Sequence, residues 1–240
     1  MATALVTGTS SGVGKATALK LLAMGIDVIG LDWKDSTIHR PHYFHFKCDV
    51  SKYEELPSLD SLGGIEYIVN NAGIVTPKAD AIAVNQIGYI NVLQKYADNN
   101  PKLKSIVIIG SSASVKGYDN REYCTSQGAR DALTKWAANN YGNDPRHVLV
   151  NELRLDGIVA ADPEKGIEGT TLEPELYAAD GLMDQIANLS ILKRLATVEE
   201  IAEWIYFILV VNTIVTGQII DVDGELMGAF KFVPYKGWND

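Results

Sequence analysis

Short segments typical of β-strands alternate with longer segments of helical periodicity along most of this chain. The strand-like segments are residues 4–6, 27–31, 42–46, 65–69, 105–109, 148–155 and 216–224. Apolar residues recur at helical spacing in residues 15–24, 81–98, 123–141 and 198–210. Because strands that alternate with helices form βαβ units, the pattern predicts an α/β fold. We expect a doubly wound parallel sheet of about seven strands, in a single domain over residues 1–240.

Composition and charge limit the classes of partner. The hydrophobic fraction of 47% is enough for a core, and the net charge is −9 without a cluster of basic residues. That charge argues against a nucleic-acid partner and against an anionic membrane surface. No apolar run reaches the roughly 18 residues that span a bilayer, and no signal peptide opens the chain. We therefore expect a soluble, cytoplasmic protein.

The cysteines and histidines predict neither a disulfide nor a metal site. Cys48 and Cys124 stand in unrelated contexts, without the spacing of metal ligands. His39, His42 and His45 crowd one segment, but a strand there would place His39 and His42 on opposite faces.

A glycine-rich loop lies between the first predicted strand and the first predicted helix. Glycines let the backbone approach a pyrophosphate, and the helix N-terminus presents N–H groups to the anion. Asp32 ends the next strand about 20 residues later, where an acidic residue accepts hydrogen bonds from the adenosine ribose. The loop predicts a dinucleotide site, and a strand-to-helix turn without a ligand is the alternative. Its candidate binding residues are Gly8, Ser10, Ser11, Gly12, Val13 and Gly14.

The spacing T-G-x-x-x-G-x-G in residues 7–14 resembles the glycine motif of the short-chain dehydrogenase/reductase family. Residues 70–73 read N-N-A-G, which matches that family's motif, and residues 216–224 resemble its T-G-Q-x-x-x-V-D-G ending. The resemblance covers about residues 2–228. It implies a Rossmann-type fold and hydride transfer between a nicotinamide cofactor and an alcohol or ketone.

The resemblance also implies further cofactor contacts. Asp49 and Val50 would hold the adenine ring, although a cap for the segment from Ser51 onward is an equal alternative for Asp49. The backbone of Ile158 would pair with the carboxamide. Asp32 would repel a 2′-phosphate, so we expect NAD rather than NADP. The small residues of the N-N-A-G motif would leave room for the cofactor: Asn71, Ala72 and Gly73.

The same resemblance assigns the catalytic candidates. Tyr123 would exchange the proton with the substrate oxygen, and Ser112 would hydrogen-bond that oxygen. Asn85 would disturb its helix and anchor a water of the proton relay; a plain helix residue is the alternative.

The pattern breaks four residues after Tyr123, where the family has Lys and this chain has Gln127. An amide can still hydrogen-bond a ribose, but it carries no charge to lower the pKa of the phenol. Lys135 is too far along the helix to replace it, and Arg121 and Lys116 are the remaining candidate cations nearby. The family's usual Pro and Thr further on are replaced by Asp156 and Ala161.

These observations favour an NAD(H)-dependent oxidoreductase that interconverts a secondary alcohol and a ketone. The alternative is a nucleotide-binding pseudoenzyme or regulatory subunit of the same fold without turnover. Residues 162–190 are predicted to form a substrate lid, with a disordered surface loop as the alternative. The substrate stays open between a hydroxysteroid, a sugar and a small ketone. We expect a homotetramer or homodimer, with the aromatic tail of residues 230–240 packed on a neighbouring subunit.

Overall fold

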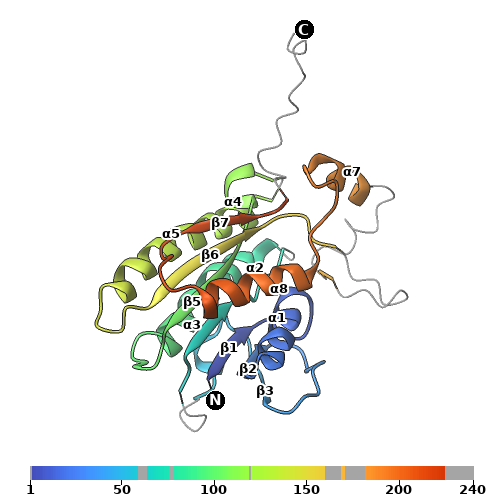
Figure 1. Cartoon of the computed structure of the whole chain (residues 1–240). Helices are drawn as coiled ribbons and strands as arrows, with labels where there is room; N and C mark the ends of the chain where they lie inside the picture. The colour runs from blue at the N-terminus through green and yellow to red at the C-terminus, as the bar shows by residue number, and fades with distance from the viewer. Residues whose placement is uncertain are drawn as a thin grey trace, which may run out of the picture.

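A computed structural model describes residues 2–58, 64–75, 78–118, 120–159, 169–170 and 182–224. The described residues form one seven-stranded parallel sheet in the order β3-β2-β1-β4-β5-β6-β7 (Figure 1). This confirms the predicted single-domain α/β fold. The strands are β1 (Thr3–Thr7), β2 (Asp27–Asp32), β3 (Tyr43–Lys47), β4 (Tyr67–Asn70), β5 (Ser105–Ser111), β6 (Leu149–Leu155) and β7 (Ile219–Val222).

Helices cover both faces of the sheet. The segments with regular α-helical geometry are α1 (Gly12–Ala23), α2 (Lys78–Ile82), α3 (Gly88–Tyr96), α4 (Ala113–Lys116), α5 (Arg121–Gly142), α7 (Leu182–Leu189) and α8 (Val198–Tyr206). A 3-10 turn, η1 (Tyr53–Glu55), and two π-helical segments, η3 (Ala83–Ile87) and η5 (Phe207–Val211), complete the described elements. The predicted helix 81–98 is thus one continuous path through α2, η3 and α3, with a π-helical segment between two α-helical ones.

The core has two layers because successive strand residues point to opposite faces of the sheet. In β1, Leu5 packs into the layer that contains Tyr89 of α3 and Ala137 of α5. Its neighbours Ala4 and Val6 pack into the other layer, between the sheet and the helices α1 and α8. Figure 1 shows α1 and α8 side by side on that face of the sheet.

The capping of α8 follows from its first turn. The Glu200 backbone N–H donates to the Thr197 hydroxyl (3.2 Å), and the Thr197 N–H donates to the Glu200 carboxylate (3.0 Å). This capping box satisfies two backbone donors that the helix itself leaves unpaired. It explains why the helix begins where the sequence predicts.

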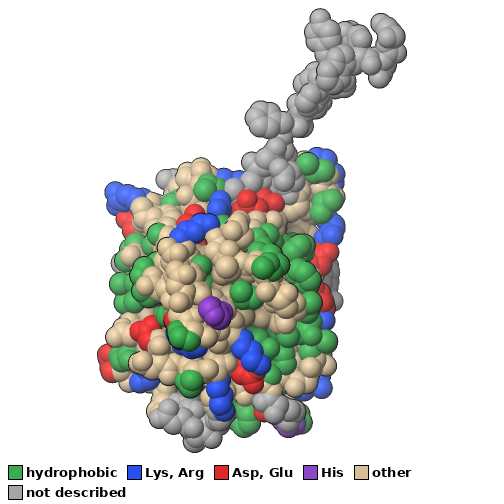
Figure 2. All heavy atoms as spheres, turned by 60° about the vertical axis from the view of Figure 1, so that its left-hand side comes forward, with side chains coloured by type: hydrophobic (Ala, Val, Ile, Leu, Met, Phe, Trp, Pro, Cys, Tyr) green, Lys and Arg blue, Asp and Glu red, His purple; other side chains and the backbone are tan. Residues whose placement is uncertain are grey.

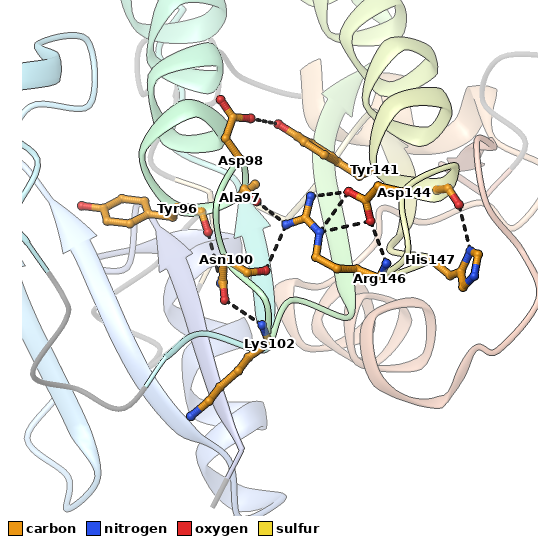
Figure 3. A network of polar contacts seen from close by, with 10 residues as sticks. Tyr96, Ala97, Asp98, Asn100, Lys102, Tyr141, Asp144, Arg146 and His147 are labelled. Carbon is orange, nitrogen blue, oxygen red and sulfur yellow. Dashed lines mark hydrogen bonds and ion pairs between the residues drawn. The ribbon is translucent and has the colours of Figure 1, made fainter.

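A polar network joins the ends of α3 and α5 at the amino edge of the sheet (Figure 3). The Arg146 guanidinium donates to the carbonyls of Ala97 (2.6 Å) and Asn100 (3.0 Å) and pairs with Asp144. In the same network the Tyr141 hydroxyl donates to a carboxylate oxygen at the end of α3 (2.6 Å). The network joins the two turns that lead into β5 and β6.

The carboxyl edge of the sheet is the place where a ligand is expected. From β1 the chain first adds strands on one side, β2 and then β3, and then crosses to the other side to add β4. In open α/β sheets, ligands bind beyond the carboxyl ends of the strands at such a reversal. The glycine loop follows β1 at this edge, and the N-N-A-G segment follows β4.

Some predictions fall on residues that lie outside the described part of the chain. These are Ala161, the aromatic tail 230–240, and the predicted lid 162–190 apart from residues 169–170 and 182–190. Among the described residues, no helix is both long and apolar enough to cross a membrane.

Candidate active site at the carboxyl edge of the sheet

The glycine loop turns sharply because two of its glycines occupy positions where a side chain would be strained or would clash with the backbone. Gly8 has a φ of +76°, and its N–H donates to the Leu31 carbonyl of β2 (2.7 Å). A Cβ on Gly14 would lie 2.0 Å from the Gly8 carbonyl oxygen, which excludes any side chain at position 14 in the first turn of α1. The N-terminus of α1 is therefore drawn tightly against the end of β1, in a form suited to a pyrophosphate.

The Asp32 carboxylate is buried beside this loop, with 7% of the residue exposed. Its Oδ2 accepts the Ser10 N–H (2.9 Å) and its Oδ1 accepts the Lys34 N–H (2.9 Å). Each carboxylate oxygen keeps a lone pair for a further donor. A negative charge is thus held rigidly where the loop and β2 meet.

The N-N-A-G segment is tied to the end of β1. The Thr7 hydroxyl accepts the N–H groups of Asn71 and Ala72, both at 2.8 Å. The Asn71 side-chain amide donates to the Thr7 carbonyl (2.8 Å). Asn71 therefore links the two neighbouring strands through its side chain, and a Cβ on Gly8 would lie 2.8 Å from that amide nitrogen.

Asp49 and Ile158, two further candidates, occupy ordered positions. Asp49 Oδ1 accepts the Ser51 N–H (2.9 Å) and the Ser51 hydroxyl (2.7 Å), so its carboxylate stabilises a turn, and its contact with an adenine ring stays a prediction. Val50 is buried against Gly88. Ile158 forms an isolated parallel bridge with Ala196, in which the hydrogen bonds are made by its two chain neighbours.

Asn85 lies fully buried in the π-helical segment η3. Its side chain accepts the Ile74 N–H (2.9 Å) and donates to the Ile74 carbonyl (2.7 Å) and the Ser126 hydroxyl (3.2 Å). The Asn85 main-chain carbonyl accepts from Nε of Arg130 (2.9 Å). π-Helical segments are frequent at functional sites, and this one brings the loop after β4 against α5.

Ser112, at the end of β5, belongs to a cluster that the sequence did not reveal. Its hydroxyl donates to Asp156 Oδ2 (2.5 Å) and lies 2.8 Å from the Tyr118 hydroxyl. The same Asp156 oxygen accepts from Lys116 (2.5 Å) and from Tyr118 (3.0 Å). Burial raises the pKa of Tyr118, so this phenol stays protonated near neutral pH. The signal in the sequence is an Asp after β6, where the resembled family has Pro.

Tyr123 lies in the first turn of α5, which Asn120 caps by accepting the Tyr123 N–H (3.0 Å). Burial raises the pKa of both Tyr118 and Tyr89, and the charge of an ionised Tyr123 adds to the rise in each case.

Gln127 lies one helical turn after Tyr123 and is fully buried. Both of its amide atoms, Nε2 and Oε1, are buried without a hydrogen-bond partner among the described residues. A buried amide without partners costs about 1–3 kcal/mol per polar group, so native proteins rarely leave one unless a ligand satisfies it. Together with Asp32 and the glycine loop, Gln127 fits a dinucleotide with a ribose at each end.

The two cations suggested by the sequence are engaged elsewhere. Arg121 has 87% of its side chain exposed and pairs with Glu122, whereas Lys116 pairs with Asp156. Sequence reasoning missed Arg130, whose guanidinium is buried behind Asn85. Its signal was positional, because residues seven apart lie on the same side of a helix and Arg130 follows Tyr123 by seven.

Comparison with known proteins agrees with this geometry. The sequence profile of the short chain dehydrogenase family matches residues 2–162. The chain belongs to this family. As a short-chain dehydrogenase it is an oxidoreductase by family, and proteins of the family bind nicotinamide cofactors.

Individual relatives match along nearly the whole short-chain dehydrogenase fold. L-xylulose reductase of Caenorhabditis elegans is 30% identical over 92% of this chain and 93% of its own length. The ligand-free aldohexose dehydrogenase of Thermoplasma acidophilum is 25% identical with a TM-score of 0.81, covering 96% of this chain and 95% of its own. A short chain dehydrogenase family protein from Francisella tularensis is 26% identical with a TM-score of 0.80, covering 95% and 100%.

Proposed function

We propose that this protein is an NAD(H)-dependent oxidoreductase that interconverts a secondary alcohol and its ketone. One arrangement carries the proposal: along a single edge of the sheet, the glycine loop and Asp32 at β1 and β2 are followed by a cluster of hydroxyl and phenol groups between β5 and α5. The cradle accounts for the cofactor, and the cluster provides groups that can bind and protonate a substrate oxygen.

The cofactor would lie between Asp32 and Gln127. The lone pairs left on the Asp32 carboxylate suit the two hydroxyls of an adenosine ribose, and its charge would repel a 2′-phosphate. At the other end, the Gln127 amide offers a donor and an acceptor to the second ribose. When bound, the nicotinamide supplies or accepts the hydride.

Tyr123 is the proposed acid and base at the substrate oxygen, with Ser112 as its hydrogen-bonding partner. Since Ser112 donates its proton to Asp156, its oxygen keeps a lone pair that can accept the proton of a substrate alcohol. To donate to a ketone oxygen, Ser112 must turn away from Asp156. Tyr118, which stays protonated, already donates to the same carboxylate oxygen and would keep it hydrogen-bonded.

A pseudoenzyme or regulatory subunit is the second candidate, favoured by one observation. Gln127 leaves the helical turn after Tyr123 without a charge, and a site that only binds dinucleotide needs none there. Binding without turnover would therefore support this second function.

The cofactor preference is tested by calorimetric titration with NADH and NADPH. We expect tighter binding of NADH, on the order of tenfold, because Asp32 repels the 2′-phosphate. Asp32→Ala should narrow the gap. The matched control is Asp35→Ala, which removes an exposed carboxylate paired with Lys47 on the same side of the fold. Equal dissociation constants for the two cofactors in the natural protein would contradict the preference.

Turnover is tested next, with a panel of ketones and alcohols at saturating cofactor. Because C. elegans and mouse relatives are L-xylulose reductases, the panel starts with ketoses and their alcohols and continues with small ketones and hydroxysteroids. Reduction that is lost in Tyr123→Phe while NADH still binds would support the enzyme. NADH binding with every substrate inert would favour the pseudoenzyme.

A further inference from the structure

A buried cation lies at the base of the candidate site. Arg130 is only 4% exposed, and its guanidinium donates to the carbonyls of Asn85 (2.9 Å) and Ile109 (2.7 Å). A third nitrogen approaches the Ala72 carbonyl at 3.5 Å. The guanidinium carbon lies 3.8 Å from the centre of the Tyr89 ring.

This charge is not neutralised by a direct ion pair. Among the described residues, no carboxylate lies within ion-pair distance of Arg130, whose partners are carbonyl dipoles and one aromatic face. Burying a charge in this way costs free energy that an apolar side chain would not. Packing alone therefore does not explain why an arginine stands here.

The location of the cation is that of the chemistry. Ala72 follows β4 in the N-N-A-G segment, Ile109 lies near the end of β5, and Asn85 is a catalytic candidate. A Cβ on Gly73 would lie 3.3 Å from one Arg130 nitrogen and 3.4 Å from the Asn85 side-chain oxygen. The guanidinium thus lies directly beneath the loop that would border the cofactor.

Arg130 lies on the same side of α5 as Tyr123. It follows Tyr123 by seven residues, about 10 Å along the axis, so the two side chains leave the helix in the same direction. Polar contacts join the two positions: Asn85 donates to the Ser126 hydroxyl (3.2 Å), which donates to the Tyr123 carbonyl (2.7 Å).

We propose that Arg130 supplies the positive charge that Gln127 lacks, favouring the ionised form of Tyr123 while positioning Asn85. This inference rests on the proposed function of the site. In this scheme two residues perform the two roles that the family's lysine, at the position of Gln127, would perform alone. The Gln127 amide binds the ribose, and the Arg130 guanidinium provides the charge. Arg130 is a positioning residue in this scheme, since it acts through Tyr123 and Asn85.

The titratable groups around Arg130 that are described next are uncharged or paired with another residue near neutral pH. On β6, burial and the nearby Asp131 raise the pKa of Glu152 to about 8, so this carboxyl is largely protonated at pH 7. On α3, burial raises the pKa of Tyr89, which stays neutral. Beyond Tyr123, the Asp156 charge is matched by Lys116, and the raised pKa of Tyr118 keeps that phenol neutral.

The test measures the pKa of Tyr123 without turnover, as the phenolate absorbance of the full chain minus that of Tyr123→Phe. Removing the charge in Arg130→Met should raise this pKa by about 1 unit, as expected for a unit charge about 10 Å away at an effective dielectric constant of about 20. Alcohol oxidation at neutral pH should then fall about tenfold. Arg130→Lys keeps the charge and should keep the pKa, and Gln127→Lys combined with Arg130→Met should restore it.

Two further variants separate charge from structure. Arg130→Gln retains hydrogen-bond donors for the carbonyls and serves if Arg130→Met does not fold. Arg121→Gln, the matched control, removes an exposed charge two residues before Tyr123 and should change nothing. An unchanged Tyr123 pKa in Arg130→Gln, or an equal rise in Arg130→Lys and Arg130→Met, would overturn the inference.

The outcome is separable from that of the proposed function. If the natural protein binds NADH but turns over no substrate, the proposed enzyme fails, and the Tyr123 titration still decides the role of Arg130. If turnover is observed while the pKa of Tyr123 is the same in the natural protein and in the Arg130 variants, the inference alone fails.

Discussion

Gln127 is an uncharged amide one helical turn after Tyr123, at a position where a cation would favour the ionised form of the phenol. Gln127→Lys adds a second cation one turn from Tyr123 and should lower the pKa of the phenol by about 1 unit or more. Alcohol oxidation at pH 7 should rise up to about tenfold, with the pH optimum shifted downward, while NADH affinity changes little. A pH profile of oxidation in the variant and the natural protein measures this. A variant that binds NADH and stays inert toward every alcohol and ketone would contradict it.

A second effect at the scale of one residue concerns Glu152, which is fully buried with Thr134 donating to one carboxylate oxygen (2.8 Å). Burial raises its pKa from 4.5 to about 8, so the folded protein binds a proton that the unfolded chain releases. Stability from this group is therefore complete below about pH 4.5 and is lost as the pH rises through 8.

We predict that Glu152→Gln abolishes this loss. Between the unfolded and folded pKa values of Glu152, each unit of rising pH lowers the free energy of unfolding by at most about 1.4 kcal/mol. That loss corresponds to about 3–5 °C in Tm. Above the folded pKa, Glu152 is ionised in both states and makes no further change. Thermal unfolding between pH 5 and pH 9 should show the natural protein falling more steeply than Glu152→Gln. Parallel curves would contradict the prediction.

Between elements, the Arg146 network at the amino edge of the sheet should contribute stability without affecting the site. Arg146→Met removes the hydrogen bonds to the carbonyls of Ala97 and Asn100 that tie the end of α3 to the turn after α5 (Figure 3). We expect a loss of about 2–3 kcal/mol and a Tm lower by about 5–10 °C.

The matched comparison is Arg121→Met, in the exposed first turn of α5, which should leave the Tm within about 1–2 °C. NADH binding should be unchanged in both variants, because the carboxyl edge lies at the other end of the strands. Weakened NADH binding in folded Arg146→Met would show that the two edges are coupled.

At the scale of the whole molecule, we predict a homotetramer, or a homodimer as its half. The face brought forward in Figure 2 carries hydrophobic side chains among polar ones. Ile87 and Ile90, on η3 and α3, are 42% and 40% exposed, and Trp136 on α5 is 49% exposed. Apolar side chains of this size gathered on two neighbouring helices are typical of a surface that a second subunit covers.

Light scattering at micromolar concentration measures this, with one variant on the surface and one away from it. Trp136→Arg should shift the mass toward smaller species, because it places a charge in the proposed interface. Met24→Arg, at the end of α1, is the control and should leave the mass unchanged. A monomeric natural protein would contradict the prediction.

The architecture of the protein follows from the amino-acid sequence. Local periodicity predicts the seven strands and the longer helices, since burial on one or two faces dictates which positions are apolar. Residues that follow strands in a parallel sheet necessarily meet at one edge, so the glycine loop, Asp32 and Asn71 could be assembled from spacing alone.

Which polar groups meet across elements depends on the packing of the folded chain. Ser112 and Asp156 are 44 residues apart, and Asn85 and Arg130 are 45 apart, so their contacts depend on how β6 and η3 pack rather than on any local pattern. Lys116 and Arg121 both lie a short way before Tyr123 in sequence, yet one is paired beside Ser112 and the other faces solvent. The burial of Arg130 is likewise a property of the packed molecule, because the free energy of a charge depends on its surroundings in space.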